Sequence, residues 1–189
     1  RDMAEEVCPV WVGYWLASPI RKLWQNPVKI LSNYVKSGMT VIDVGSAMGF
    51  FTLPLAQLVD ESGCVIAVDV QEKMLEKLQK RARKKNLEDR IQTHLAETAS
   101  LNLHGRVDTA DFALAFAVVH EVPDQHQLFL ELHNVLKADA QLLLAEPKGH
   151  VSEKAYGDSI HIARRAGFDV GKALEIRGAI ANILIRSES

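Results

Sequence analysis

From residue 39 onward, short apolar runs rich in β-branched residues alternate with longer amphipathic segments. The apolar runs predict strands at 39–44, 64–70, 90–95, 111–118 and 140–145, and the amphipathic segments predict helices at 50–59, 71–85, 125–136 and 153–166. Two last apolar runs, 168–176 and 177–185, follow one another with no room for a helix, which predicts an antiparallel hairpin at the edge of a sheet. Strands that alternate with helices predict an α/β fold. We therefore expect a three-layer sandwich around a mostly parallel, seven-stranded sheet that ends in this hairpin.

The first 38 residues do not follow this alternation, and we predict that residues 1–38 form a helical extension and residues 39–189 the main domain. Trp11, Tyr14 and Trp15 fall within one turn of each other if this region is helical. Such a helix is suited to a lid that excludes water from a site. The alternative is that these aromatics cover the sheet as part of the core. We expect a mixture of the two, with Tyr14 facing the site.

The amino-acid composition limits the kinds of partner that we expect the protein to bind. The chain is 48% hydrophobic and 24% charged, with a formal net charge of −2. These values are typical of a soluble domain and give no reason to expect nucleic-acid binding. The seven histidines lie on different predicted elements, and the two cysteines, Cys8 and Cys64, are far apart, so we expect no metal site. The cysteine pattern suits a reducing compartment, and no apolar run is long enough to span a bilayer. We therefore predict a cytoplasmic protein without stable membrane insertion.

The segment that follows the first strand carries the clearest chemical signal. Asp43 ends an apolar run, and Gly45 and Gly49 follow where the chain must turn into a helix. Asp69 ends the next apolar run in the same manner. In open α/β sheets ligands collect at the carboxyl ends of the strands, and an acid at the second strand can accept ribose hydroxyls. A buried carboxylate at position 43 needs a polar or cationic partner.

Taken together, the residues from about 39 to 185 resemble the class I methyltransferases that use S-adenosylmethionine, which have a Rossmann-like fold. The family's first motif is an acid followed by three glycines at alternate positions. Here Ala47 replaces the middle glycine, Glu97 stands where an aspartate is more common, and 136–140 lacks the usual proline and glycines of a turn. The resemblance implies that S-adenosyl-L-methionine is the cofactor. It also implies a cofactor site formed by Asp43, Gly45, Ser46, Ala47, Met48, Gly49, Phe50, Asp69, Val70, Met74, Ala96, Glu97, Phe116 and Ala117.

The resemblance further implies in-line transfer of the methyl group to an acceptor. The small size of the chain, without an appended recognition domain, favours a small-molecule acceptor. Candidate catalytic residues are Tyr14, His120 and Glu121, of which His120 is the best general base because it can titrate near neutral pH. A loop histidine that bonds the backbone is an equally weighted interpretation of His120.

Two alternatives remain open from the sequence. A subunit could bind S-adenosylmethionine without performing the chemistry. A nicotinamide-binding Rossmann domain would need glycines at the positions of Gly45, Ala47 and Phe50, and Phe50 does not fit the third. The acceptor atom and the oligomeric state are not readable from the sequence.

Overall fold

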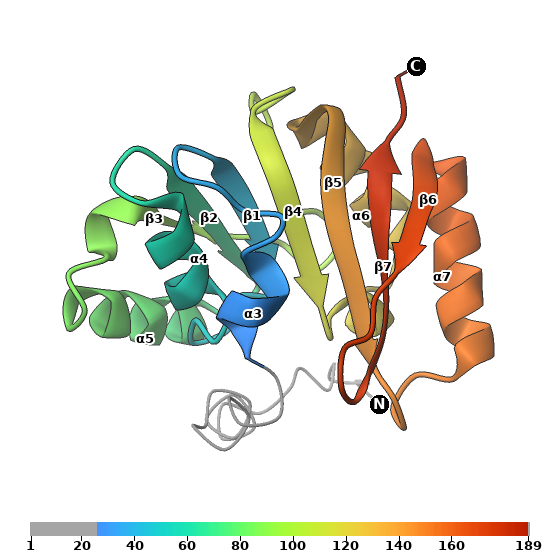
Figure 1. Ribbon diagram of the computed structural model, residues 1–189, viewed down its shortest axis with the longest axis horizontal. Helices are drawn as coiled ribbons and strands as arrows, with labels where there is room; N and C mark the ends of the chain where they lie inside the picture. The colour runs from blue at the N-terminus through green and yellow to red at the C-terminus, as the bar shows by residue number, and fades with distance from the viewer. Residues whose placement is uncertain (1–25, 189) are drawn as a thin grey trace, which may run out of the picture.

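The computed structural model describes residues 26–188, which form a single mixed sheet with helices on both faces (Figure 1). The sheet has seven strands in the order β3-β2-β1-β4-β5-β7-β6. The strands are β1 (Thr40–Val44), β2 (Cys64–Asp69), β3 (Ile91–Leu95), β4 (Ala110–Phe116), β5 (Leu136–Pro147), β6 (Phe168–Ala173) and β7 (Ala179–Arg186). Neighbouring strands from β3 to β5 are parallel, whereas β7 pairs antiparallel with both β5 and β6. The predicted α/β fold class and the C-terminal hairpin are confirmed.

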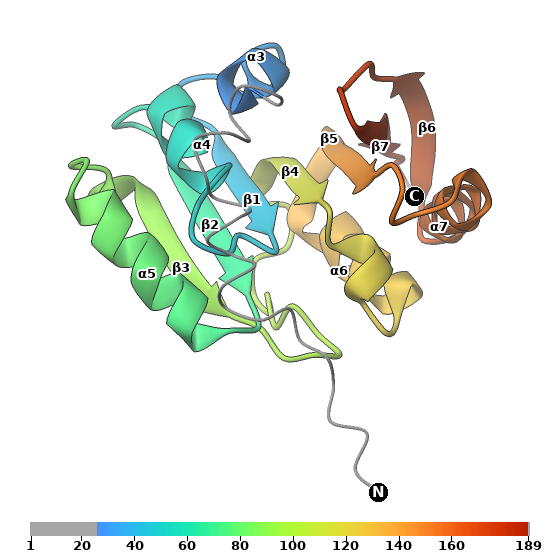
Figure 2. The same ribbon diagram turned by 90° about the horizontal axis from the view of Figure 1, so that it is seen from below.

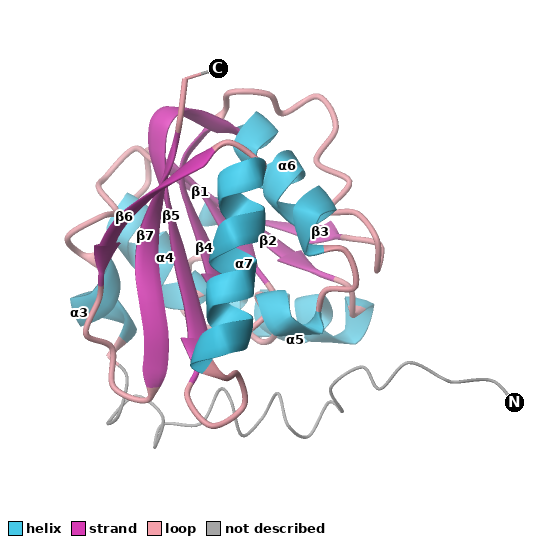
Figure 3. Ribbon diagram, turned by 90° about the vertical axis from the view of Figure 1, so that its right-hand side faces the viewer, coloured by secondary structure: helices cyan, strands magenta, loops and turns pink. Residues whose placement is uncertain are grey.

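Within residues 26–188, five α-helices pack on the two faces of this sheet. Helices α3 (Pro27–Leu31), α4 (Thr52–Val59) and α5 (Glu72–Arg83) cover one face, and α6 (Gln125–Val135) and α7 (Glu153–Arg165) cover the other (Figures 2 and 3). Two 3₁₀ turns, η1 (Glu88–Arg90) and η2 (Val119–Glu121), precede β3 and α6. The described core therefore consists of two apolar clusters, one on each face of the sheet.

Alternation along each strand explains these two clusters. On β1, Val41 packs toward α4 and α5, and the next residue, Ile42, packs toward the face of α6. Both side chains are fully buried, because a parallel strand covered on both faces has no solvent side. This is why the strand sequences are nearly continuous apolar runs.

The order of strands reverses between β1 and β4. The chain builds outward from β1 to β2 and β3, then crosses back to place β4 on the other side of β1. The loops after β1 and β4 therefore leave the sheet in different directions, and their divergence opens a crevice at the carboxyl ends of these two strands.

Some predicted boundaries are wrong. Strand β5 begins at Leu136, directly after α6, where we expected the end of a helix and a turn before residue 140. Leu136 is buried and pairs with Ala110, whereas 137–139 are exposed, and Asp139 takes a φ of 60°. The register shifts between Ala110 and Phe112, so a bulge replaces the expected turn.

Other boundaries shift for local reasons. Strand β4 ends at Phe116 rather than 118, because Ala117 adopts a φ of 58° and turns the chain out of the sheet. The bend after β1 delays α4 to Thr52, and β6 ends at Ala173, next to a register shift against β7. Helix α3 lies within the predicted extension 1–38, but Trp11, Tyr14 and Trp15 lie outside the described residues. The division into an extension and a main domain stays a prediction.

Candidate active site

A pocket lies at the reversal point of the sheet, across the carboxyl ends of β1, β2, β3 and β4. Its wall is formed mainly by the ends of these strands and the loops that follow them, with Met74 of α5 and Leu128 of α6. The lining residues are Val44, Gly45, Ala47, Val68–Gln71, Met74, Ala96–Leu101, Ala117, Val118, Glu121, Val122, Asp124 and Leu128. Nine of the predicted site residues are among them: Gly45, Ala47, Asp69, Val70, Met74, Ala96, Glu97, Ala117 and Glu121.

Small residues shape the bend between β1 and α4. Gly45, Ala47 and Gly49 all have positive φ values, of 70°, 46° and 85°. A Cβ at Gly45 would lie 2.8 Å from Cγ2 of Val118, and one at Gly49 would lie 2.4 Å from Cδ1 of Leu78. The two glycines therefore allow the bend to pack against the β4 loop and α5, in a conformation that L-residues disfavour.

Asp69 joins this bend to the end of β2. Its Oδ2 accepts a hydrogen bond from the main-chain N–H of Ala47 at 2.8 Å, and its Oδ1 accepts one from Gln71 N–H at 2.8 Å. Burial raises the pKa of the Asp69 carboxyl, and the amide hydrogen bonds oppose this rise. An ionised carboxylate has about four acceptor sites, more than these amides occupy, so Asp69 can still accept a hydroxyl hydrogen from a ligand in the pocket.

Asp43 is placed behind the pocket rather than in its wall. The side chain is 3% exposed, and its Oδ2 accepts a hydrogen bond from Thr52 Oγ1 at 2.5 Å. Burial raises the pKa of Asp43 to about 7, with the nearby Asp69 adding to the rise. Thr52 is the first residue of α4, so this hydrogen bond fixes the start of the helix against the end of β1.

Five other predicted cofactor residues also lie outside the pocket wall, namely Gly49 of the bend and four residues with side chains that could pack or bind. Met48, Phe50 and Phe116 are buried apolar side chains. Phe51, next to Phe50, packs edge-on against it and also contacts Phe116. Ser46 is 4% exposed, and its hydroxyl has no hydrogen-bond partner among the described residues. The structure thus uses these side chains for packing, and any contact they make with a ligand would come from their main chain.

The 3₁₀ turn after β4 brings His120 against Glu146 at the end of β5. Nδ1 of His120 lies 2.6 Å from Oε2 of Glu146, and the His120 main-chain N–H donates to Oε1 of the same carboxylate at 3.2 Å. Glu146 is 1% exposed. His120 itself is absent from the pocket wall, but its Nε2 lies 3.9 Å from Oε1 of Glu121, which lines the pocket.

Electrostatics in this corner favour a charged imidazole. The hydrogen bond to Glu146 is the main cause that raises the pKa of His120, and burial opposes it. Burial is the main cause that raises the pKa of Glu121, and the charges of Glu146 and Asp69 raise it further. The predicted pair His120 and Glu121 is therefore coupled to a third group, Glu146.

Glu146 directly follows the strand predicted at 140–145 and is not among the site residues predicted from the sequence. The signal that could have found it is the one that singled out Asp43 and Asp69, an acid that ends a buried apolar run. The loop 98–101 and the residues Val118, Val122, Asp124 and Leu128 were also missed as pocket residues. They are ordinary loop and helix residues whose sequence carries no chemical pattern.

Neither a metal site nor a membrane-spanning helix is found in the part of the chain that is described. No group of three or more His, Cys, Asp or Glu side chains within 26–188 is arranged to hold a metal ion. No helix in the same range has the length and apolar character needed to cross a membrane.

This strand order, with the antiparallel β7 inserted between β5 and β6, together with a pocket of acids and small residues at the reversal point, defines a class I methyltransferase fold. A family model described as "Methyltransferase domain" matches residues 35–171. The chain belongs to this family, whose class I members use S-adenosylmethionine.

Three known proteins illustrate the likeness. A solved S-adenosylmethionine-dependent methyltransferase from Aquifex aeolicus is 26% identical with a TM-score of 0.84, and the match covers 95% of this chain and 98% of that one. The demethylmenaquinone methyltransferase of Lactobacillus johnsonii is 32% identical over 112 residues, which are 59% of this chain and 45% of the relative. The ubiquinone/menaquinone biosynthesis C-methyltransferase UbiE of Escherichia coli is 27% identical over 152 residues, covering 78% of this chain and 59% of UbiE. The chain therefore spans about half the length of these curated relatives.

Proposed function

We propose that this protein transfers a methyl group from S-adenosylmethionine to a small-molecule acceptor by in-line displacement. The observation that carries the proposal is the pocket at the reversal point, which combines Gly45 and Ala47 of the bend with the carboxylates of Asp69 and Glu97. Family membership and the Aquifex aeolicus structure support the same chemistry.

The carboxylates and apolar side chains of the pocket wall fit a nucleoside. Asp69 stands at the end of β2 with acceptor capacity for ribose hydroxyls. Val70, 46% exposed, and Met74 and Leu101 supply apolar surface to the pocket, and Glu97 adds a carboxylate to the same wall. A purine ring needs such apolar walls with a few polar groups at its edge.

The amino acid part of the donor would lie near the bend and the end of β4. Main-chain groups of Gly45, Ala47 and Ala117 border this part of the pocket. Asp43 lies behind the bend, and in our proposal it stabilises the cationic end of the donor through the bend rather than by direct contact.

The methyl group would then face the side of the pocket formed by Val118, Glu121 and Val122. The sulfonium supplies its own activation, so the task of the protein is to align the acceptor with the methyl group, a contribution of about 7–11 kcal/mol in favourable cases. We propose His120 as general base with Glu121 beside it, which adds about 10²–10⁴-fold when the acceptor arrives protonated. Tyr14, outside the described residues, remains a candidate from the sequence.

A small-molecule acceptor agrees with the names of two relatives, one a demethylmenaquinone methyltransferase and the other a ubiquinone/menaquinone biosynthesis C-methyltransferase. The net charge of −2 gives no support for a nucleic-acid acceptor. The cysteine pattern supports a cytoplasmic location as part of the proposal.

Calorimetric titration tests the cofactor, and an acceptor screen with labelled methyl donor tests the transfer. We expect S-adenosylmethionine and its demethylated product to bind, and Asp69→Asn to weaken both while Asp158→Asn on exposed α7 does not. Binding of NAD or NADP in place of S-adenosylmethionine would contradict the proposal. Cofactor binding without transfer to any acceptor would instead indicate a non-catalytic subunit.

A further inference from the structure

We infer that Glu146 is a positioning residue for methyl transfer, which holds His120 so that Nε2 is the atom that accepts a proton from the acceptor. This inference rests on the proposed function above and assigns the class of acceptor, namely one whose reacting atom carries a proton.

Glu146 holds His120 at two points. One carboxylate oxygen contacts Nδ1 at 2.6 Å and the other accepts the main-chain N–H at 3.2 Å, so both the ring and its backbone are fixed. The carboxylate comes from β5, a strand paired on both sides, where Glu146 stands opposite Ile180 of β7. A 1%-exposed side chain on an internal strand has little freedom, and a base positioned by it has little freedom either.

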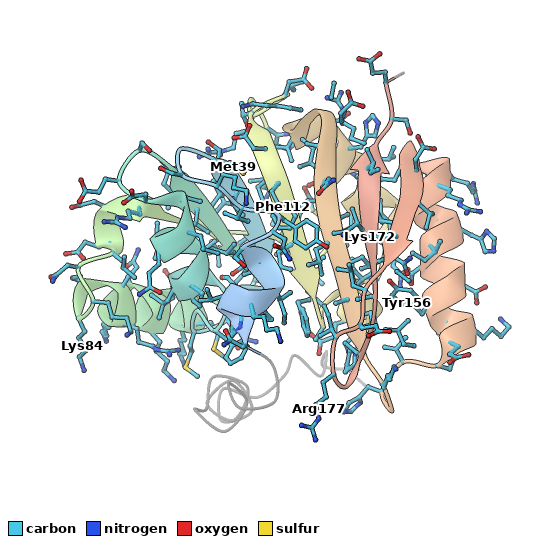
Figure 4. All side chains as sticks on the ribbon, in the orientation of Figure 1. Met39, Lys84, Phe112, Tyr156, Lys172 and Arg177 are labelled. Atoms are coloured by element: carbon cyan, nitrogen blue, oxygen red, sulfur yellow. The ribbon has the colours of Figure 1, made fainter. Side chains whose placement is uncertain are left out.

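Tyr156 of α7 packs against the strand that carries Glu146. Tyr156 projects from α7 toward the sheet (Figure 4), and its hydroxyl lies 3.3 Å from the Leu144 carbonyl oxygen and 3.1 Å from Oδ1 of Asn182. Burial is the main cause that raises the pKa of Tyr156, and the charge of Glu146 raises it further, so this hydroxyl stays neutral. The negative charge of Glu146 is therefore met by His120 and not by a second ionised group from Tyr156.

This arrangement selects one tautomer of His120. An ionised carboxylate can only accept hydrogen bonds, so the hydrogen of a neutral imidazole must sit on Nδ1. The lone pair of the neutral ring is then on Nε2, 3.9 Å from the Glu121 carboxylate of the pocket wall. The ring nitrogen that can take a proton is the one at the pocket side.

The charged groups around His120 strengthen it as a base. Glu146 of β5 and Glu121 of η2 both favour the imidazolium, while Asp69 at β2 and His150 after β5 act on Glu121. From α7, Tyr156 is near enough for the charge of Glu146 to raise its pKa. The negative charge that surrounds His120 makes proton uptake at Nε2 more favourable than in a free histidine.

The proposed step conserves protons, electrons and charge. The acceptor atom gives its proton to Nε2 and uses its electron pair to bond the methyl carbon, while the pair of the broken carbon–sulfur bond returns to sulfur. One positive charge is lost at the sulfonium and one is gained at the imidazolium, beside Glu146. A weakly acidic hydroxyl such as that of a phenol is the acceptor class that this geometry suits, because an acceptor that is already an anion or a free lone pair needs no base.

Histidine-selective NMR tests the inference on the intact chain, with the product S-adenosylhomocysteine as the probe ligand. Two-bond ¹H–¹⁵N spectra of the native protein should show the Nδ1–H tautomer for His120. In Glu146→Gln the His120 pKa should fall by about one to three, the range that an opposite charge produces. Glu153→Gln, an exposed residue of α7, is the matched control and should leave it unchanged. His120→Gln assigns the resonance.

Kinetics on any acceptor from the screen give a second readout. The acid limb of the kcat/KM profile should move to lower pH in Glu146→Gln, kcat should fall about 10-fold or more, and the Kd of S-adenosylhomocysteine should not change. Glu146→Asp, which keeps the charge, should retain a raised His120 pKa. If Glu146→Gln does not fold, Glu146→Asp is the variant in which the His120 tautomer, its pKa and kcat are measured.

An Nε2–H tautomer in the native protein, or an unchanged His120 pKa in a folded Glu146→Gln variant, would overturn the inference. Failure of the proposed function gives a different result, because the cofactor product would then not bind even though the His120 tautomer and pKa behave as described.

Discussion

The carboxylate of Asp69 accepts the main-chain N–H of Ala47 at 2.8 Å and so ties the end of β2 to the bend that follows β1. The second carboxylate oxygen accepts the N–H of Gln71, which immediately precedes α5. One side chain thus fixes two walls of the same pocket. The residue that we propose for ribose binding is also part of the frame that shapes the site.

Because Asp69 has both roles, two substitutions at position 69 should differ in their effects on cofactor binding and on stability. Asp69→Asn retains one oxygen for one of the amides, so the fold should persist while S-adenosylmethionine binds several-fold or more weakly. Asp69→Ala leaves both amides without their acceptor and should in addition lower the free energy of unfolding by about 1–3 kcal/mol. Calorimetry and urea unfolding measure the two effects. Equal cofactor affinity in the native protein and both variants would contradict the ribose assignment.

The bend offers a matched pair of substitutions. Ala47 has a φ of 46°, so Ala47→Gly should relieve strain and raise the free energy of unfolding by up to about 1 kcal/mol. Gly49→Ala should do the reverse, by about 1–3 kcal/mol, because φ is 85° and the new Cβ would lie 2.4 Å from Leu78 Cδ1. Urea denaturation at fixed pH checks both, and a stabilised Gly49→Ala variant would contradict the close approach of Gly49 to Leu78.

Asp43 should make stability depend on pH. Its pKa is raised from 3.8 to about 7 by burial, so the protonated form favours the folded state. The contribution of this group is full below pH 3.8 and is lost as the pH rises toward 7, at a cost of roughly 2–4 kcal/mol. Asp43→Asn should remove this dependence and be more stable than the native protein at pH 8.

Urea titrations at pH 4, 6 and 8 provide the measurement. Asp60→Asn is a control at an exposed acid. If the native protein and Asp43→Asn changed in parallel across this range, the carboxyl would not carry the expected shift. We also expect Asp43→Asn to bind S-adenosylmethionine more weakly, since the acid's charge is lost from behind the bend.

His120 and Glu146 should show strong coupling in stability. His120→Ala leaves the buried carboxylate without its ring partner and should cost about 1–3 kcal/mol at pH 6. Adding Glu146→Gln should recover part of this loss, because the charge that needs a partner is then removed. A double-mutant cycle from thermal or urea unfolding gives the coupling energy, and strictly additive effects would show that the two side chains do not interact.

The same cycle has a defined pH dependence. The folded pKa of His120 is raised, so the stability that it contributes is full below about 6.5, the usual value. It is lost as the pH rises through the higher folded pKa. The penalty of His120→Ala should therefore be larger at pH 6 than at pH 9, and the opposite trend would contradict the sign of the pKa shift.

The fold class, and the edge of the sheet where the pocket lies, could be predicted from residue patterns along the chain. Strands buried on both faces require apolar runs such as 65–68 and 112–116, and helices on a sheet require an apolar stripe. An acid directly after such a run marks a strand end, so Asp69 could be assigned to the pocket, where the structure places it. Local patterns carry this information because alternation and turn geometry depend on near neighbours in the chain.

The tertiary structure alone decided which strand ends meet and where each side chain points. His120 and Glu146 are 26 positions apart and come together because β4 and β5 are neighbours in the sheet. The left-handed turn at Ala117, by contrast, moves the chain out of β4 and toward the pocket. Asp43 was expected at the ligand but points toward Thr52, and β5 begins with a bulge at 136–139 instead of after a turn. Strand order, register and side-chain direction depend on packing between segments distant in sequence, and no local pattern of residues encodes that packing.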